Sequence, residues 1–193
     1  GSFTHTYADG ASTPTITVSA TDEDGSFVLG SKSLTVLNVA PTPVITFGPG
    51  SLTEGTSYTI NLSAADPAGA YDVAWFSVDW GDGFSTQSLL GPGPRSHTYR
   101  DDPTGSADTG THTVRVTVYD EDDGMAYVTQ GVTVTNVAPT ATVGGAAVAG
   151  EGSVYTLSVG AVVDPGTDVS SGYTIDWGDG STDTVTSAQW PAA

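Results

Sequence analysis

Carboxylate side chains are concentrated in short segments of this sequence and recur at a fixed spacing. Four adjacent acidic residues run from Asp120 to Asp123, and an Asp-x-Asp pair occurs at Asp22/Asp24 and again at Asp120/Asp122. Calcium takes about six to eight oxygen ligands, mostly carboxylates and carbonyls, at about 2.3–2.6 Å. These segments are therefore the first candidates for a binding site.

Histidine and tryptophan side chains offer two other kinds of chemistry. His97 lies in the tripeptide HTY, which also occurs at His5, and no spacing places a serine and an aspartate around either ring as a hydrolase triad requires. We therefore predict structural histidines and no catalytic residues. Trp80 and Trp177 open the same tetrapeptide, WGDG, and are expected to pack in the core. Trp75 is expected on the opposite strand face, where an exposed ring could stack on a sugar.

The composition excludes several classes of protein. The 193 residues contain no cysteine, so disulfides, thiol nucleophiles and cysteine-ligated zinc are all excluded. Four Lys and Arg against 22 Asp and Glu give a net charge of −18, which disfavours nucleic acids and anionic membranes as partners. No apolar run reaches the roughly 18 residues of a membrane span. We expect a secreted β-protein, located extracellularly or at a cell surface, with no membrane insertion.

An internal repeat organises the chain. NVAPT begins at Asn38 and at Asn136, 98 residues apart, and the acidic runs at Asp22 and Asp120 have the same spacing. WGDG recurs after 97 residues. Agreement among separate landmarks indicates a repeat of about 98 residues.

The repeat divides the chain into one complete copy and two partial ones. Residues 40–137 form the complete copy, residues 1–39 correspond to its second half, and residues 138–193 correspond to its first half. Because a complete copy separates the two halves, we expect each half to be completed by another copy, head to tail, and not within one chain. This could be a complementing chain or the continuation of one long polypeptide.

Alternating apolar residues predict short antiparallel strands within the complete copy. SYTINLSA and HTVRVTVYD alternate with a period of two, and no window has helical periodicity. In immunoglobulin-like lettering, strands are expected near 43–47 (A), 58–64 (B), 73–80 (C), 84–90 (C′ or D), 97–99 (E), 112–119 (F) and 126–135 (G). Asp82-Gly83 is expected to form a tight turn in which glycine supplies a positive φ.

The motifs VDWGDGFS, HTY and HTVRVTVYDEDDG, in this order, resemble the pattern of polycystic-kidney-disease (PKD) domains. Trp80 stands where that family usually has Phe. The NVAP segments are also similar, less specifically, to the linkers between cadherin-like repeats. The resemblance implies an all-β fold made of tandem immunoglobulin-like antiparallel β-sandwiches, secreted or exposed at a surface.

In an immunoglobulin-like topology the B–C and F–G loops lie at the end where strand A enters, so acidic residues from both loops should meet the linker there. We therefore expect calcium sites at the module junctions, with magnesium disfavoured because it keeps its waters. The alternative is that these residues form turns and solubilising charge only. The candidate ligands are Asn38, Glu54, Asp66, Asp120, Asp122, Asn136, Asp164, Asp22 and Asp24.

Two functions remain in competition. The first is a structural repeat of an extracellular filament, stalk or adhesin shaft, assembled head to tail from further copies with calcium-stiffened junctions. The second is an accessory substrate-binding module of a secreted hydrolase. Surface glycans and proteins are the further candidate partners, and the chain is not expected to be an enzyme.

Overall fold

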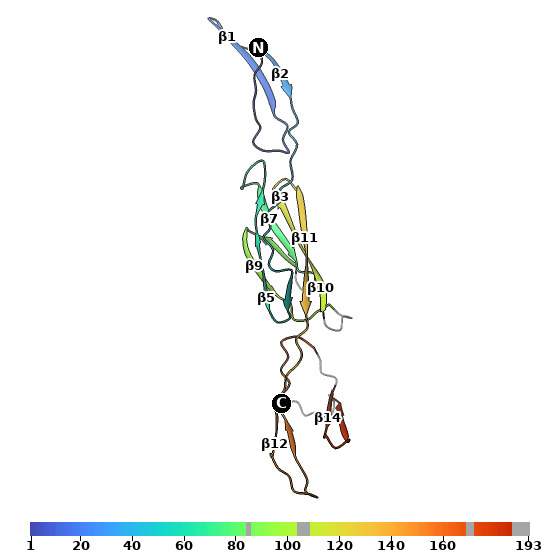
Figure 1. Cartoon of the computed structure of the whole chain (residues 1–193). Coiled ribbons are helices and arrows are strands. Elements are labelled where there is room, and N and C mark those ends of the chain that lie inside the picture. Colours follow the sequence, from blue (N-terminus) through green and yellow to red (C-terminus); the bar gives the residue numbers. More distant parts are fainter. Residues whose placement is uncertain (84–85, 104–108, 169–171, 187–193) are drawn as a thin grey trace. The chain divides into compact units, whose positions relative to one another are not determined.

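The computed structural model describes residues 1–83, 86–103, 109–168 and 172–186, and every regular element in this part of the chain is a β-strand (Figure 1). No helix in these ranges is long and apolar enough to cross a membrane. The chain falls into two compact units. The first contains residues 1–50, 58–97 and 112–132, and the second contains residues 51–57, 98–111 and 133–193.

The larger sheet of the first unit is built on two long strands, β10 (Thr109–Asp120) and β11 (Met125–Thr135). Its strand order is β4-β11-β10-β7-β8, where β7 is Val73–Asp79 and β8 is Thr86–Leu90. β10 pairs antiparallel with β7, and β7 pairs antiparallel with β8. The edge strand β4 (Ser51–Thr53) pairs in parallel with the last three residues of β11, and this pairing lies in the second unit.

The smaller sheet of the first unit pairs β5 (Ser57–Leu62) with β9 (Gly93–Thr98). Strand β3 (Thr42–Pro43) pairs with β6 (Ala64–Ala65), and a bridge joins Thr46 to Asn61. One face of each sheet carries the apolar residues of its strands, which are buried together. The buried apolar side chains of this unit are Tyr58, Ile60, Leu62, Phe76, Val78, Trp80, Val114, Val116, Val118 and Val132.

This unit is an immunoglobulin-like antiparallel β-sandwich, as the alternating pattern predicts. Strands A, B, C, F and G fall where they are expected, and the E strand begins earlier, at Gly93, because its residues pair along β5. Phe84, expected at the start of the fourth strand, lies outside the described residues.

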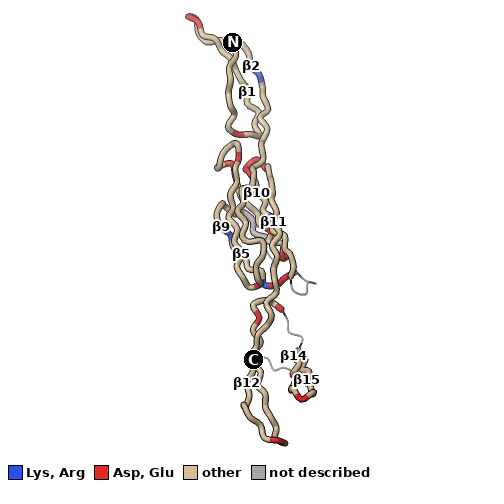
Figure 2. Tube along the Cα trace, in the orientation of Figure 1, with Lys and Arg blue, Asp and Glu red and all other residues tan. Residues whose placement is uncertain are grey.

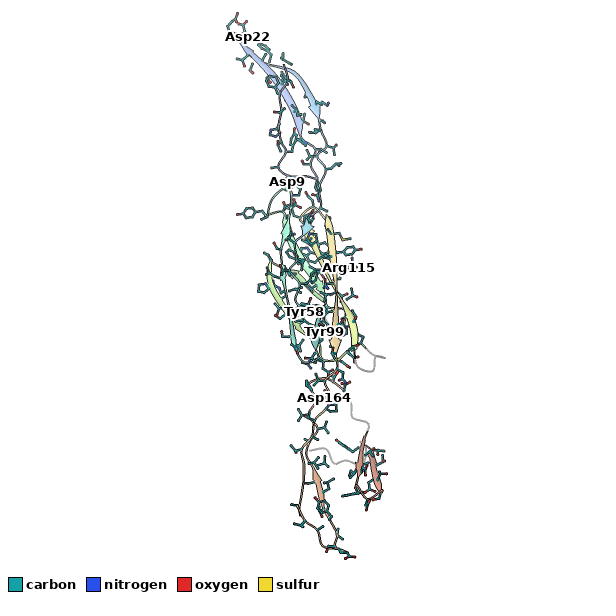
Figure 3. All side chains as sticks on the ribbon, viewed as in Figure 1. Asp9, Asp22, Tyr58, Tyr99, Arg115 and Asp164 are labelled. Carbon is teal, nitrogen blue, oxygen red and sulfur yellow. The ribbon has the colours of Figure 1, made fainter. Side chains whose placement is uncertain are left out.

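Residues before the sandwich form one hairpin, β1 (Thr15–Asp22) with β2 (Gly25–Ser33). Its strands pair only with each other in the described part of the chain. Asp22 lies at its turn, as the label in Figure 3 shows.

The second unit holds two further strand pairs. β12 (Val143–Gly145) pairs with β13 (Leu157–Val159), and β14 (Gly172–Asp176) pairs with β15 (Thr182–Thr186). Within the described residues, these four strands form two separate two-stranded sheets. If the predicted repeat holds, they correspond to strands that share one sandwich in residues 40–137.

Candidate cation sites in the acidic loops

Acidic residues gather in the turns at strand ends, as Figure 2 shows in red. In the first unit, Asp66, Asp72 and Asp120 each place one carboxylate oxygen within 4.8 Å of the other two. Asp66 follows β6, Asp72 immediately precedes β7, and Asp120 ends β10. We call these three residues, together with Asp9 and Asp122, the first acidic cluster.

Asp72 is the least satisfied member of this cluster. Its side chain is only 4% exposed, and both of its carboxylate oxygens are buried without a hydrogen-bond partner. The Oδ2 atom of Asp66 is likewise buried without a partner. Buried carboxylates normally have partners, since an unpaired one loses its hydration without compensation. This pocket of oxygens therefore favours a bound positive charge.

The remaining oxygens of the cluster are fixed by the loops themselves. Asp120 Oδ1 accepts hydrogen bonds from the backbone N–H groups of Asp122 (3.0 Å) and Gly124 (2.6 Å). Asp66 Oδ1 accepts from the N–H of Ala68 at 2.8 Å. A Cβ atom at Gly124 would collide with the Asp120 carboxylate, so a larger residue there would require this side chain to move.

Asp72 also belongs to a second triplet, with Asp9 and Asp122, whose oxygens lie within 4.8 Å of one another. Burial, followed by the nearby Asp66 carboxyl and the Asp9 and Asp120 charges, raises the pKa of Asp72 to about 6. Two events can relieve this charge concentration: protonation of Asp72, or the binding of a divalent cation.

A second acidic cluster lies in the second unit and consists of Glu54, Asp101 and Asp168. Glu54 is 2% exposed. Its Oε1 accepts a hydrogen bond from the N–H of Val137 at 2.8 Å, and its Oε2 is buried without a partner. Burial raises the pKa of Glu54, the Val137 hydrogen bond opposes this rise, and the nearby aspartates add to it. A Cβ atom at Gly166 would lie 2.6 Å from Oε2, so the backbone there closes tightly over this carboxylate.

The structure brings together some of the predicted ligands in these clusters. Asp66, Asp120 and Asp122 lie in the first, and Glu54 lies in the second. Asp164 Oδ1 accepts from the Gly166 N–H at 2.8 Å, and its charge contributes to the raised pKa of Glu54.

The other predicted ligands are placed differently. Asn38 donates from Nδ2 to Asp120 Oδ2 at 2.7 Å, so in this arrangement it orients a carboxylate. Asn136 Oδ1 is buried without a hydrogen-bond partner. Asp22 and Asp24 are exposed, joined by an N–H to Oδ1 bond of 3.0 Å, and belong to none of the clusters found in the described ranges.

Sequence reasoning did not identify Asp72, Asp9, Asp101 or Asp168. Asp9 and Asp101 carry a signal, because each stands two residues after an HTY tripeptide. Asp72 and Asp168 each open an Asp-Val pair that stands 8 or 9 residues before a WGDG tetrapeptide, which is a weak signal, and only the folded loops bring them to the clusters.

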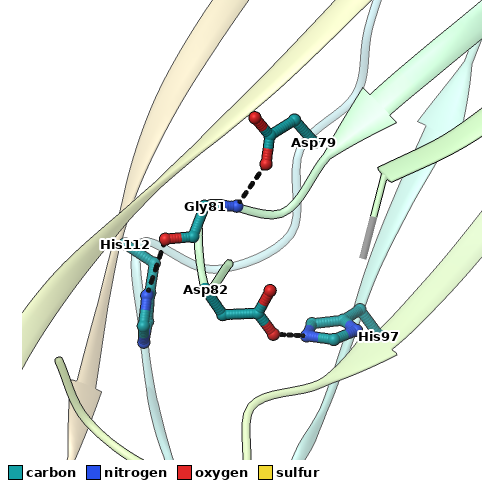
Figure 4. Close-up of polar contacts among 5 residues, drawn as sticks. All are labelled: Asp79, Gly81, Asp82, His97 and His112. Carbon is teal, nitrogen blue, oxygen red and sulfur yellow. Dashed lines mark hydrogen bonds and ion pairs between the residues drawn. The ribbon is translucent and has the colours of Figure 1, made fainter. Parts of the chain in front are cut away.

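The WGDG turn is built from local hydrogen bonds (Figure 4). The Gly81 N–H donates to Asp79 Oδ1 at 2.9 Å, and Gly83 has φ +78°, which confirms the expected positive φ. His97 Nε2 lies 2.6 Å from Asp82 Oδ2, and its ring stacks on Trp80 with centroids 5.1 Å apart. These contacts hold strand β9 against the turn, a structural role.

Aromatic side chains lie on the outer face of the larger sheet. Trp75 stacks on Tyr119 at 3.8 Å between centroids, and the Arg115 guanidinium lies 4.1 Å from the centroid of the Tyr127 ring. Trp75 is therefore on the face opposite Phe76, as expected, and has aromatic neighbours.

No protein-family model matches the sequence, and no curated protein matches it. Among solved structures the chain is similar to the PKD domain of an M14-like peptidase from Thermoplasmatales archaeon SCGC AB-540-F20. The sequence identity is 30%, the match covers 50% of this chain and 97% of that chain, and the TM-score is 0.41. It is also similar to the PKD1 domain of Vibrio anguillarum Epp, with 22% identity, 50% and 95% coverage and a TM-score of 0.36. A third similarity is to fibronectin(III)-like modules of Clostridium thermocellum CbhA, with 16% identity, 65% and 63% coverage and a TM-score of 0.38.

Proposed function

We propose that this chain is a structural repeat of an extracellular filament, stalk or adhesin shaft, whose modules follow one another head to tail through calcium-stiffened junctions. The observation that carries the proposal is Asp72, a buried carboxylate with two unpartnered oxygens that faces Asp66 and Asp120. A role in solubility would not require a buried acid, since solubilising charges are exposed.

The clusters are bonded to the segments that join the repeats. Asn38, in the first NVAP segment, donates to Asp120, and the Val137 N–H, in the second, donates to Glu54. A cation in either cluster would therefore restrain a linker as well as a loop. Calcium fits best because it accepts many oxygen ligands in irregular geometry, whereas magnesium demands a near-octahedral shell and keeps its waters.

Thermal unfolding with and without calcium tests the proposal. Extracellular calcium modules have dissociation constants of about 10⁻⁴–10⁻³ M, and tenfold saturation of one site stabilises the folded state by about 1.4 kcal/mol. We expect melting to rise by several degrees in millimolar calcium relative to EDTA, and by less in equal magnesium. Asp72→Asn should remove much of this rise, while Glu23→Gln, at an exposed acid outside the clusters, should leave the calcium response of the sandwich unchanged.

Identical melting curves in calcium and in EDTA would overturn the calcium part of the proposal. An equal loss of calcium response in Asp72→Asn and Glu23→Gln would also count against it, because general charge reduction would then account for the effect.

The aromatic face supports a second candidate, an accessory substrate-binding module of a secreted hydrolase. Trp75, Tyr119 and the exposed Tyr127 lie on one sheet face, and aromatic rings of this kind can stack on sugar rings. Co-sedimentation with insoluble polysaccharides tests it. Retention that is lost in Tyr127→Ala and kept in Tyr71→Ala, an exposed tyrosine outside this face, would favour the accessory module over the shaft.

A further inference from the structure

The β1–β2 hairpin exposes apolar side chains whose repeat counterparts are fully buried. Val18 is 55% exposed, whereas Val116, its counterpart 98 residues later, is 0% exposed. Ile16 is 45% exposed, whereas its counterpart Val114 is 0% exposed, and Ile16 and Val18 lie together along a hollow of about 310 Å³. The hairpin therefore carries the core face of a sandwich without the strands that would cover it.

The second unit exposes the complementary set. Tyr155 and Trp177 are 38% and 39% exposed, whereas their counterparts Tyr58 and Trp80 are 1% and 0% exposed. Tyr155 and Trp177 already meet edge to face, with centroids 6.5 Å apart, as Tyr58 and Trp80 do at 6.3 Å. This half-core is thus already arranged as in the complete repeat, and one side of it is open.

We propose that residues 138–186 of one copy are covered by residues 1–39 of a second copy, with β14 pairing antiparallel with the partner's β1 in the register that β7 and β10 adopt. This inference rests on the proposed head-to-tail function and specifies its interface. We expect the covering segment to come from a second copy. Residues 1–39 correspond to the strands of residues 40–137 that cover the equivalent apolar face. The corresponding strands of residues 40–137, β9, β10 and β11, are already paired within their own sandwich.

The register follows from the pairing of β7 with β10. Val78 is the Cα partner of Val116, so Ile175 is expected opposite Val18 of the second copy. Ser77 is the partner of Thr117, so Thr174 is expected opposite Ser19. The first pair points into the completed core and the second pair points outward, because successive side chains alternate across a strand.

The turn contacts of the complete repeat should recur across this interface. His97 stacks on Trp80 and pairs with Asp82. By the repeat, His5 of the second copy should lie on Trp177 and pair with Asp179.

Gly178 provides an independent indication of the missing strands. A Cβ atom at Gly81 would lie 2.5 Å from the Thr113 carbonyl oxygen, which belongs to β10. Gly178 occupies the same place in the second WGDG turn, yet a Cβ atom there would meet nothing within 4 Å. The counterpart of Thr113 is Thr15, which the second copy would supply.

Completion would also give Asp22 and Asp24 a function. They correspond to Asp120 and Asp122, so the second copy would bring them beside Asp164 as Asp120 lies beside Asp66. The cross-linking and sedimentation experiments below are therefore carried out in millimolar calcium.

Paired cysteines test the register, and the chain has no native cysteine to interfere. Opposite residues of an antiparallel pair have Cα atoms about 4.5–5.5 Å apart, within the range that a disulfide spans. We expect Ser19→Cys/Thr174→Cys to form a reducible ladder of dimers and higher species under mild oxidation. The control Ser19→Cys/Asp176→Cys is shifted by two residues, to a diagonal distance of about 7–8 Å, and should give only the background of the single-cysteine chains.

Gly178→Ala and Gly180→Ala test the covering strand. Both glycines have positive φ and open space around them, so the two variants carry similar local strain in the isolated chain. In the completed sandwich only Gly178→Ala would meet a backbone carbonyl, since the counterpart of Gly180, Gly83, has nothing within 4 Å. We expect Gly178→Ala to weaken self-association, measured by sedimentation, at least tenfold more than Gly180→Ala.

The outcomes separate this inference from the proposed function. Equal cross-linking of the matched and shifted pairs, a disulfide formed only within one chain, or a monomer at every concentration would each overturn the completion. Calcium-dependent stabilisation of the sandwich is measured separately and would still support the shaft in those cases. A matched-pair ladder together with the Gly178→Ala defect would support the interface.

Discussion

Gly81→Ala should destabilise the sandwich far more than Gly83→Ala, although the two glycines stand in the same turn. Their φ values are +80° and +78°, so an alanine at either position adopts a backbone conformation that side chains disfavour. The positions differ in their surroundings. A Cβ atom at Gly81 would lie 2.5 Å from the Thr113 carbonyl oxygen and 2.8 Å from its nitrogen, whereas one at Gly83 would meet nothing within 4 Å.

The expected magnitudes follow from these two terms. Positive φ costs an alanine about 1–2 kcal/mol, and this is the whole effect expected for Gly83→Ala. Gly81→Ala carries in addition the collision with β10 backbone, which cannot rotate away, and such overpacking costs about 1–3 kcal/mol. We therefore expect Gly81→Ala to lower the free energy of unfolding by about 2–5 kcal/mol, and the difference between the variants to isolate the packing of the turn on β10.

Urea unfolding of both variants, followed by tryptophan fluorescence, measures this difference. The slope of free energy against urea should be unchanged, so that the midpoints report stability directly. Equal destabilisation by the two substitutions would refute the reasoning, because the turn would then not pack against Thr113 as described.

Two further predictions concern protonation and core packing. In EDTA, melting should rise as pH falls from about 6 towards 4, because the pKa of Asp72 is about 6 when folded and its ordinary value is 3.8. Between these two values the folded state binds more protons than the unfolded chain, so stability is lost as pH rises towards 6. Calorimetry should show that Asp72→Asn reduces this dependence, the remainder coming from other acids with a raised pKa such as Glu54, and an unchanged dependence would exclude Asp72 as a source. Trp80→Ala should lower the free energy of unfolding by about 3–5 kcal/mol, because the ring is fully buried. Trp177→Ala, at a half-exposed ring, should leave urea unfolding of the sandwich nearly unchanged. Similar losses for the two variants would contradict the difference in burial.

The strands of the sandwich could be predicted from the sequence because their two faces have different chemistry. Tyr58, Ile60 and Leu62 alternate with polar residues along β5, and this period specifies both the strand and the face that is buried. Gly83 could be predicted because a turn between closely paired strands requires a positive φ. Short-range rules of this kind act within a few residues and need no knowledge of the rest of the fold.

The acidic sites could be predicted only in part, because they depend on loops that meet across long sequence distances. Asp66 and Asp120 belong to repeated motifs and were expected at one end of the sandwich, where the structure places them. Asp72 lies in an irregular turn between β6 and β7, and nothing in its local sequence distinguishes a buried acid from a solvated one. The assignment of residues 1–39, 40–137 and 138–193 as parts of one repeat stays a prediction, as does the binding of calcium.

The parallel pairing of β4 with β11 determines how tension would act on this part of the chain. Leu52 is paired with Val134 between two further rungs, so a strand near the start of the repeat lies alongside its last strand and runs in the same direction. Tension applied to the chain on the N-terminal side of β4 and on the C-terminal side of β11 would slide these two strands past each other. All the hydrogen bonds between the paired residues would then be loaded at the same time. In an antiparallel hairpin such as β1–β2, pulling on both ends opens one rung at a time. A shaft built from this repeat would therefore resist a sudden pull at the bonds that join Ser51–Thr53 to Thr133–Thr135.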